Sequence, residues 1–261
     1  MSDANASNGT SESTSESTSN RSKSAAPVAM LAAMAVLVAA GSSPAQPRSP
    51  APIPTLPLSI TVAVASADGA SADGANANGA GADGATADGA GAEVVDRAWI
   101  DAQVENANTI FRPHGVSFRV ARRARMDARH ARLESRADRH ALGGLLTERV
   151  IDCFIVLSLR DVDEPSRYRQ GVHWRPRGEA YPAGAHFVIV SSIAGPTVLA
   201  HELGHYFGNG HSDVPGNIMS YERGDVPPFF DDAQAARIRS SARRFLRRGE
   251  LVAADALATA E

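Results

Sequence analysis

The pattern of apolar and polar residues changes period several times between residues 58 and 250. Five segments are short, apolar and rich in β-branched side chains, which predicts β-strands. These predicted strands cover residues 58–64, 116–120, 151–159, 171–174 and 186–190. The segment 151–159 is nearly continuous in apolar residues, which is typical of a central strand in a parallel sheet.

Three helices are predicted between and after these strands. The first has apolar residues at the spacing of one helix face and ends at Pro113 and Gly115. The second should begin at Pro196, a residue type favoured in the first helical turn, and stop at Gly208. The third begins near Asp231, where Gln234 is placed to complete a capping box. The apolar stripes are Ile100, Val104, Ala107 and Phe111 in the first helix and Ile238, Ala242, Phe245 and Leu246 in the third.

The order of elements is strand, helix, four strands, helix, loop and helix. This order predicts an α/β sandwich with a mostly parallel sheet. The Arg-rich residues 122–149 interrupt the pattern, and we expect them to form a surface excursion. Cys153 is the single cysteine of the 261-residue chain, which excludes an intramolecular disulfide. It lies in the predicted central strand, so we expect a buried, inert thiol.

The first 57 residues differ in composition from the rest. Residues 1–24 are polar and cannot bury enough apolar surface to fold, so we expect disorder. Residues 25–45 follow a basic flank, contain a short apolar run and end in small residues, which indicates a secretory signal peptide or an uncleaved signal anchor. Residues 46–57 form a Pro-rich linker. Both interpretations of the apolar run predict a secreted or extracytoplasmic protein, with membrane contact only if the segment is not cleaved.

The folded domain is expected over residues 58–250, with a low-complexity insertion at 65–92 and a flexible tail at 251–261. The insertion repeats Ala-Asp-Gly, a composition that favours a flexible loop. Its Asp-Gly spacing fits neither an EF-hand loop nor the glycine-rich nonapeptide repeat, which argues against calcium binding.

The formal net charge of −3 implies no bulk attraction to nucleic acid. Arginines cluster at residues 119–139 and 237–248, and we expect solvated faces in both places. No nucleic-acid partner is expected, and we expect the protein to be a monomer.

Chemistry is concentrated in the segment HELGHYFGNGH at residues 201–211. His201 and His205 are four residues apart, so on a helix both imidazoles lie on one face and can share one metal ion. Glu202 adjoins the first ligand and can reach a metal-bound water as a general base. A chance match to five fixed positions is on the order of one in ten thousand for a chain of this size.

The third histidine, His211, needs a sharp turn after the helix. Gly208 can supply the positive-φ conformation for this turn at little steric cost. Three neutral imidazoles leave Zn²⁺ at least one open position, which is typical of a catalytic site. The sequence therefore predicts a catalytic zinc centre formed by His201, His205 and His211.

These residues resemble the HExxHxxGxxH motif of the metzincin zinc peptidases. Met219, eight residues after His211, matches the family's methionine turn beneath the metal. The short spacing is similar to the matrixins, whereas Met219-Ser220-Tyr221 is similar to the astacins and serralysins. The resemblance implies a twisted, mostly parallel five-stranded sheet with an antiparallel edge strand at residues 172–175. It also implies that Tyr221 ligates zinc or stabilises the transition state. A matrixin-like cysteine latch is not expected.

The resemblance implies a zinc-dependent endopeptidase that cleaves an extended peptide or protein. The alternatives are a non-catalytic zinc-binding domain for adhesion or partner binding, and a zinc hydrolase of a non-peptide amide. Glu202 argues against the first alternative, because a structural site needs no carboxylate there. We expect a wall of the substrate pocket from residues 222–230, whose apolar Pro227 to Phe230 suggest a preference for apolar side chains. His173 would border the cleft.

Overall fold

The computed structural model describes residues 51–65, 91–178, 180–182 and 184–257. The expected polar N-terminus, the signal or anchor segment and most of the Ala-Asp-Gly insertion lie outside these residues. No helix in the described part of the chain has the length and apolar character needed to cross a membrane.

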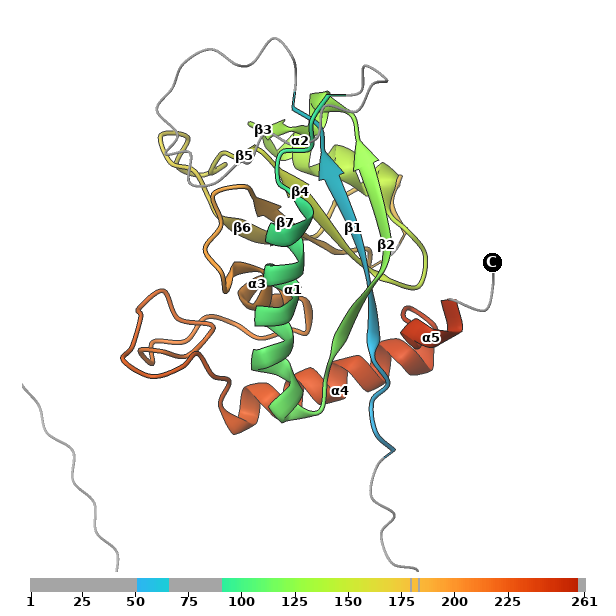
Figure 1. Cartoon of the computed structure of the whole chain (residues 1–261), viewed down its shortest axis with the longest axis vertical. Helices are drawn as coiled ribbons and strands as arrows, with labels where there is room; N and C mark the ends of the chain where they lie inside the picture. Colours follow the sequence, from blue (N-terminus) through green and yellow to red (C-terminus); the bar gives the residue numbers. More distant parts are fainter. Residues whose placement is uncertain (1–50, 66–90, 179, 183, 258–261) are drawn as a thin grey trace, which may run out of the picture. The chain divides into compact units, whose positions relative to one another are not determined.

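A five-stranded sheet with the order β2-β1-β4-β7-β6 organises the domain (Figure 1). The first four of these strands pair in parallel, and β6 pairs with β7 in the antiparallel direction at the edge. The predicted α/β class and mostly parallel sheet are therefore confirmed. The strands are β1 (Leu56–Ala63), β2 (Phe118–Met126), β4 (Ile151–Val156), β6 (Gly171–Trp174) and β7 (Phe187–Ser191).

Strand β4 shows why the central segment lacks polar alternation. Cys153 and Ile155 face one apolar cluster, whereas Phe154 and Val156 face a second cluster on the other side of the sheet. Because successive side chains of a strand point to opposite faces, a strand that is covered on both faces is apolar throughout. Cys153 is fully buried, as expected.

Three long helices belong to the first cluster: α1 (Arg97–Phe111), α3 (Val198–Tyr206) and α4 (Asp232–Arg248). Asp231 and Gln234 form the predicted capping box of α4. The start of α3 differs from the prediction, because Thr197 is the N-cap and Pro196 precedes it. Pro196 therefore lies in the turn before the helix and not in its first turn.

Two amide side chains fix α1 to its neighbours. Asn108 accepts from the backbone N–H of Phe118 at 2.7 Å and donates to the carbonyl of the same residue at 3.0 Å. Gln103 donates to the carbonyl of Gly195 at 3.0 Å and accepts from the N–H of Leu199 at 3.4 Å. The second pair of bonds holds the start of α3 against α1, and so it sets the position of the helix that carries the histidines.

Residues 122–149 are more ordered than a surface excursion. Strand β2 continues to Met126, and β3 (Arg132–Leu133) and α2 (Arg136–Ala141) follow; β3 pairs in parallel with β5 (Ser158–Leu159). The expectation of solvated arginines is wrong for Arg139, which is 2% exposed and lies 4.9 Å from the ring centre of Trp174. Its guanidinium donates to the carbonyl of Arg160 at 2.5 Å, so tertiary packing overrides the polar composition of this segment.

The two ends of the insertion meet at its base. The N–H of Ala65 donates to the carbonyl of Ala92 at 2.7 Å, and Val64 forms an antiparallel bridge with Glu93. The chain therefore leaves and rejoins the domain at one point.

Residues 251–257 were expected within a flexible tail, but they pack on the domain. Leu251 and Ala254 are buried, and the N–H of Ala254 donates to the carbonyl of Thr55 at 2.9 Å. The folded domain therefore extends past residue 250, and its C-terminal segment covers the start of β1.

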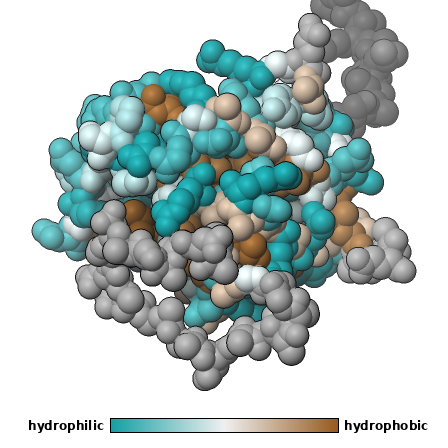
Figure 2. All heavy atoms as spheres, turned by 90° about the horizontal axis from the view of Figure 1, so that it is seen from above, coloured by the Kyte–Doolittle hydropathy of each residue, from teal (hydrophilic) through white to brown (hydrophobic). Residues whose placement is uncertain are grey.

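The face seen from above in Figure 2 is mostly hydrophilic, with apolar residues visible between polar ones. Six large apolar side chains are exposed in the described part of the chain. They are Tyr168, Ile193, Val214, Tyr221, Val226 and Phe229. Three of the six follow Met219 in the sequence, so the loop after this methionine carries much of the exposed apolar surface.

Candidate metal centre

Helix α3 places His201 and His205 one turn apart, and their Nε2 atoms are 3.1 Å from each other. The helix ends because Gly208 adopts φ = +94°, a conformation that favours glycine. The chain then turns back and brings His211 Nε2 to 3.1 Å from His205 Nε2. One ligand atom from each histidine lies within 4.8 Å of the other two, so the structure brings the three predicted ligands together.

The hydrogen bonds of the rings indicate which nitrogens are free to bind a cation. His201 Nδ1 is 2.7 Å from the carbonyl oxygen of Ile218, and His205 Nδ1 is 2.8 Å from that of Asn209. A carbonyl oxygen can only accept, so both Nδ1 atoms carry the proton and both Nε2 atoms present lone pairs.

The convergence of the Nε2 atoms fits a bound cation. Between His201 and His205 two lone pairs face each other, with no proton to bridge them, and a cation between them removes this repulsion. Zinc–nitrogen bonds of about 2.0–2.1 Å in a tetrahedral site place neighbouring nitrogens about 3.3 Å apart. The spacing in the structure is close to this value.

The protonation of the histidines suits the same role. Burial lowers the pKa of His205 to about 4, and it also lowers the pKa of His201 and of His211. All three rings are therefore neutral near pH 7. A neutral imidazole is the form that binds a metal.

Glu202 lies on α3 beside the histidines and is buried. Burial raises its pKa to about 8, although the backbone N–H of His173 and the charge of Arg169 act in the opposite direction. Strand β6 passes very close to this side chain, because a Cβ on Gly171 would stand 2.8 Å from Glu202 Cγ and 2.9 Å from Oε1. Gly171 therefore lets the edge strand approach the carboxylate.

Met219 lies beneath α3, at the position predicted for the methionine turn. Asn217 shapes this turn, because its Oδ1 accepts from the N–H of Met219 at 2.9 Å. The Asn217 amide also exchanges two hydrogen bonds with Gln234 at 2.8 and 3.2 Å. Gln234 thus caps α4 and ties that helix to the floor of the histidine site.

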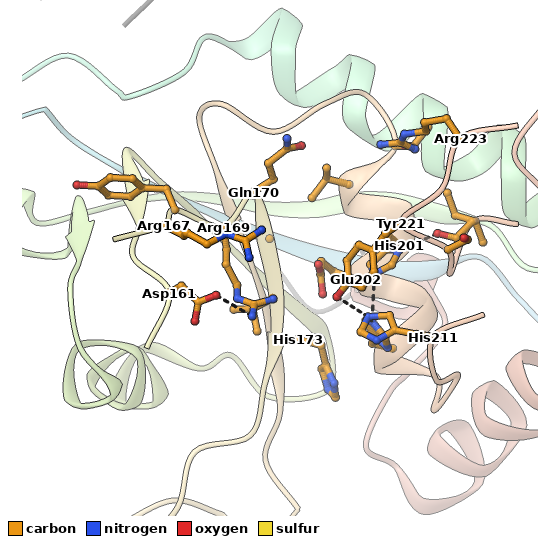
Figure 3. A pocket seen from close by; sticks show the side chains of 18 residues that line it. Asp161, Arg167, Arg169, Gln170, His173, His201, Glu202, His211, Tyr221 and Arg223 are labelled. Atoms are coloured by element: carbon orange, nitrogen blue, oxygen red, sulfur yellow. Dashed lines mark hydrogen bonds and ion pairs between the residues drawn. The ribbon is translucent and has the colours of Figure 1, made fainter. Parts of the chain in front are cut away.

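Tyr221 extends over the histidines from the other side. Its hydroxyl is 2.9 Å from His211 Nε2 (Figure 3). The residue is 70% exposed, and its ring centre lies 4.6 Å from that of His211. The hydroxyl therefore reaches the nitrogen that would bind the metal.

The histidines open into a cleft of about 790 Å³. Strand β6 forms one wall with Val172 and His173, which agrees with the expectation for His173. His173 Nε2 is 2.8 Å from His186 Nδ1, and the His186 ring stacks on Tyr206 at 4.0 Å. This pair of half-buried histidines therefore supports the edge strand from behind.

The pocket wall expected from residues 222–230 differs in its chemistry. Arg223 lines the cleft, whereas the apolar residues 227–230 do not. Phe230 is instead buried in the core, where it packs edge-on against Phe111 at 4.9 Å. The positively charged side chain of Arg223 therefore lies where an apolar wall was expected.

The roles of several residues in the site were not predicted. Gly171, Asn217 and Gln234 act through contacts between distant segments, and no periodicity marks them. Composition could have indicated Asp161 and Arg169, because the segment 160–169 contains three acidic and three basic side chains just before the predicted edge strand.

The sequence matches no family model and none of the curated proteins with which it was compared. Among solved structures, the chain is similar to metalloproteinase-II from Bacteroides fragilis, with 15% sequence identity and a TM-score of 0.44. The alignment covers 75% of this chain, and this chain spans 55% of the length of the bacterial protein. We base the functional assignment on the geometry of the metal centre.

Proposed function

We propose that the chain is a zinc-dependent endopeptidase of the metzincin type, acting on extended peptides. The observation that carries this proposal is the convergence of three Nε2 atoms beside a buried carboxylate in an open cleft. A purely structural zinc site is closed by four protein ligands, whereas these three histidines leave a position open to solvent.

Each residue of the site would have a separate role in the reaction. His201, His205 and His211 would hold zinc, which would supply a Lewis acid and a water that is nucleophilic near neutral pH. Glu202 accepts the proton of the attacking water and delivers it to the leaving amine. Its buried carboxylate lies beside the histidines, which suits a group that takes a proton from water and gives it to the leaving amine. The hydroxyl of Tyr221 donates to the developing oxyanion.

The substrate would lie along strand β6. This strand pairs with β7 on one side only, so its other edge offers backbone groups to an extended peptide. Val172 and His173 line the cleft beside the metal centre. A peptide that adds to this edge passes over the histidines, which favours a peptide substrate over a small amide.

Metal content and cleavage test the proposal together. We expect the purified chain to bind one zinc per molecule and to cleave casein or a quenched-peptide library until a chelator is added. Glu202→Gln should keep the zinc and lose cleavage by a factor of about 10² or more. His205→Ala should lose the zinc at neutral pH.

Two outcomes would count against the proposal. A folded, zinc-loaded wild-type chain that cleaves no member of the library would favour the non-catalytic zinc-binding domain. Full activity in Glu202→Gln would remove the general base from the mechanism.

A further inference from the structure

Three arginines line the cleft around the metal centre (Figure 3). Arg167 and Arg169 come from the segment before β6, and Arg223 comes from the loop after Met219. The acidic residues of the same lining are Asp161 and Glu202, and both are buried. The accessible charge of the cleft is therefore positive, and a bound zinc ion would increase it.

Arg167 and Arg169 already have acidic partners. Arg169 Nη2 is 2.8 Å from Asp161 Oδ2, and Asp161 Oδ1 accepts from the backbone N–H groups of Asp163 and Glu164. Arg167 Nη1 is 3.0 Å from Glu164 Oε2. These pairs orient the two guanidinium groups and offset their charge.

Arg223 differs from both. Its Nη1 donates to the neutral Thr197 hydroxyl at 3.1 Å, and it forms no ion pair with any described residue. The bond to Thr197 holds the guanidinium at the start of α3, close enough for its charge to lower the pKa of His201. Most of its five N–H donors remain available on the wall of the cleft.

We propose that Arg223 binds a carboxylate of the peptide substrate near the scissile bond. An arginine fork matches the two oxygens of a carboxylate, and the uncompensated charge supplies the attraction. The carboxylate can be an Asp or Glu side chain or the C-terminus of the peptide. This inference rests on the proposed peptidase function and adds the class of substrate to it.

Matched peptides test the inference with the zinc-loaded full-length chain. Each Glu in a set of cleaved peptides is replaced by Gln, which keeps the size of the side chain and removes its charge. We expect kcat/KM to be at least about tenfold higher for a Glu peptide than for its Gln partner at one position beside the cleaved bond. The ratio should fall as NaCl is raised, because the site is partly exposed.

Substitutions of single arginines show which residue causes the Glu/Gln selectivity. Arg223→Gln should reduce the Glu/Gln ratio to about one while cleavage of the Gln peptide continues. Arg167→Gln removes the same charge from the same cleft and should retain most of the ratio, since Arg167 is paired. Arg112→Gln, which breaks a remote pair with Glu105, serves as the control for folding and basal activity.

Each result decides a separate point. Equal cleavage of Glu and Gln peptides, both free and C-terminally amidated, would overturn the inference and leave the peptidase function standing. An equal loss of the ratio in Arg223→Gln and Arg167→Gln would overturn the assignment to Arg223. Equal cleavage of Glu and Gln peptides, with a lower kcat/KM for both after C-terminal amidation, would identify the C-terminal carboxylate as the bound group. Failure to cleave any peptide would instead count against the proposed function itself.

Discussion

Met219 and Gly204 are in direct contact beneath the metal centre. A Cβ on Gly204 would stand 2.4 Å from the sulfur of Met219, well inside the contact distance of the two atoms. Helix α3 can therefore rest on the thioether only because residue 204 has no side chain. The glycine between the two helical histidines and the methionine below them form one packing unit.

We predict that Gly204→Ala destabilises the domain by about 1–3 kcal/mol and weakens zinc binding, because α3 must move away from Met219. Urea denaturation and zinc titration measure the two effects. Gly210→Ala is the matched control within the same motif, since a Cβ there would meet nothing within 4 Å. Equal stability of the two variants would show that the contact with Met219 does not position α3.

A second glycine, Gly171, lies against Glu202, the proposed general base. We predict that Gly171→Ala lowers kcat by at least about tenfold with zinc still bound, because the new Cβ would displace the Glu202 side chain from a position it needs for proton transfer. Steady-state kinetics and metal analysis on the same sample measure this. Gly144→Ala, where a Cβ is unopposed, should leave kcat unchanged. A zinc-loaded Gly171→Ala enzyme with normal kcat would contradict the prediction.

Tyr221→Phe should lower kcat by about tenfold and leave zinc affinity nearly unchanged. The variant lacks the hydroxyl proposed to donate to the oxyanion, while the three histidines proposed to hold the metal remain. A comparison of kcat, KM and zinc content separates the two roles. An unaltered kcat would exclude Tyr221 from the chemistry, and a large loss of zinc would make it mainly a ligand.

We predict that Asp152 makes the free energy of unfolding depend on pH. Burial raises its pKa to about 6, and its Oδ1 has no hydrogen-bond partner. The folded state therefore holds a proton that the unfolded state releases near pH 4. This residue favours folding at low pH, and its contribution is lost as pH rises through 6, by on the order of 2–3 kcal/mol.

Asp152→Asn should remove this dependence, so the variant should gain stability relative to the wild type at pH 8 but not at pH 4. Urea midpoints of both proteins at several pH values measure the difference. The buried histidines titrate in both proteins, and their effect cancels in the comparison. A constant difference across the range would contradict the raised pKa.

Features that depend on residues close together in the sequence could be predicted from it. His201, His205 and Glu202 could be placed because helical spacing fixes their geometry within two turns. Gly208 could be placed because a turn toward His211 requires its conformation. The sheet followed from apolar strands whose two faces are both covered.

Contacts between distant segments escaped prediction. The burial of Arg139 depends on Trp174, and the requirement for Gly171 depends on Glu202 in another element. Arg223 lies in an irregular loop, where no period shows which side chains turn toward the cleft. The apolar residues 227–230 suggested an apolar wall, because composition does not show which side chains point into the cleft.

Ala65 and Ala92 hold the two ends of the insertion together, so the folding of the domain does not depend on the length of the insertion. Because both ends are held at one place, adding residues between them costs only the slowly growing entropy of a longer loop. The sheet and the metal centre need no particular sequence there. Such a position lets the domain acquire or lose a repetitive segment, or carry a grafted module, without a change in its histidine site.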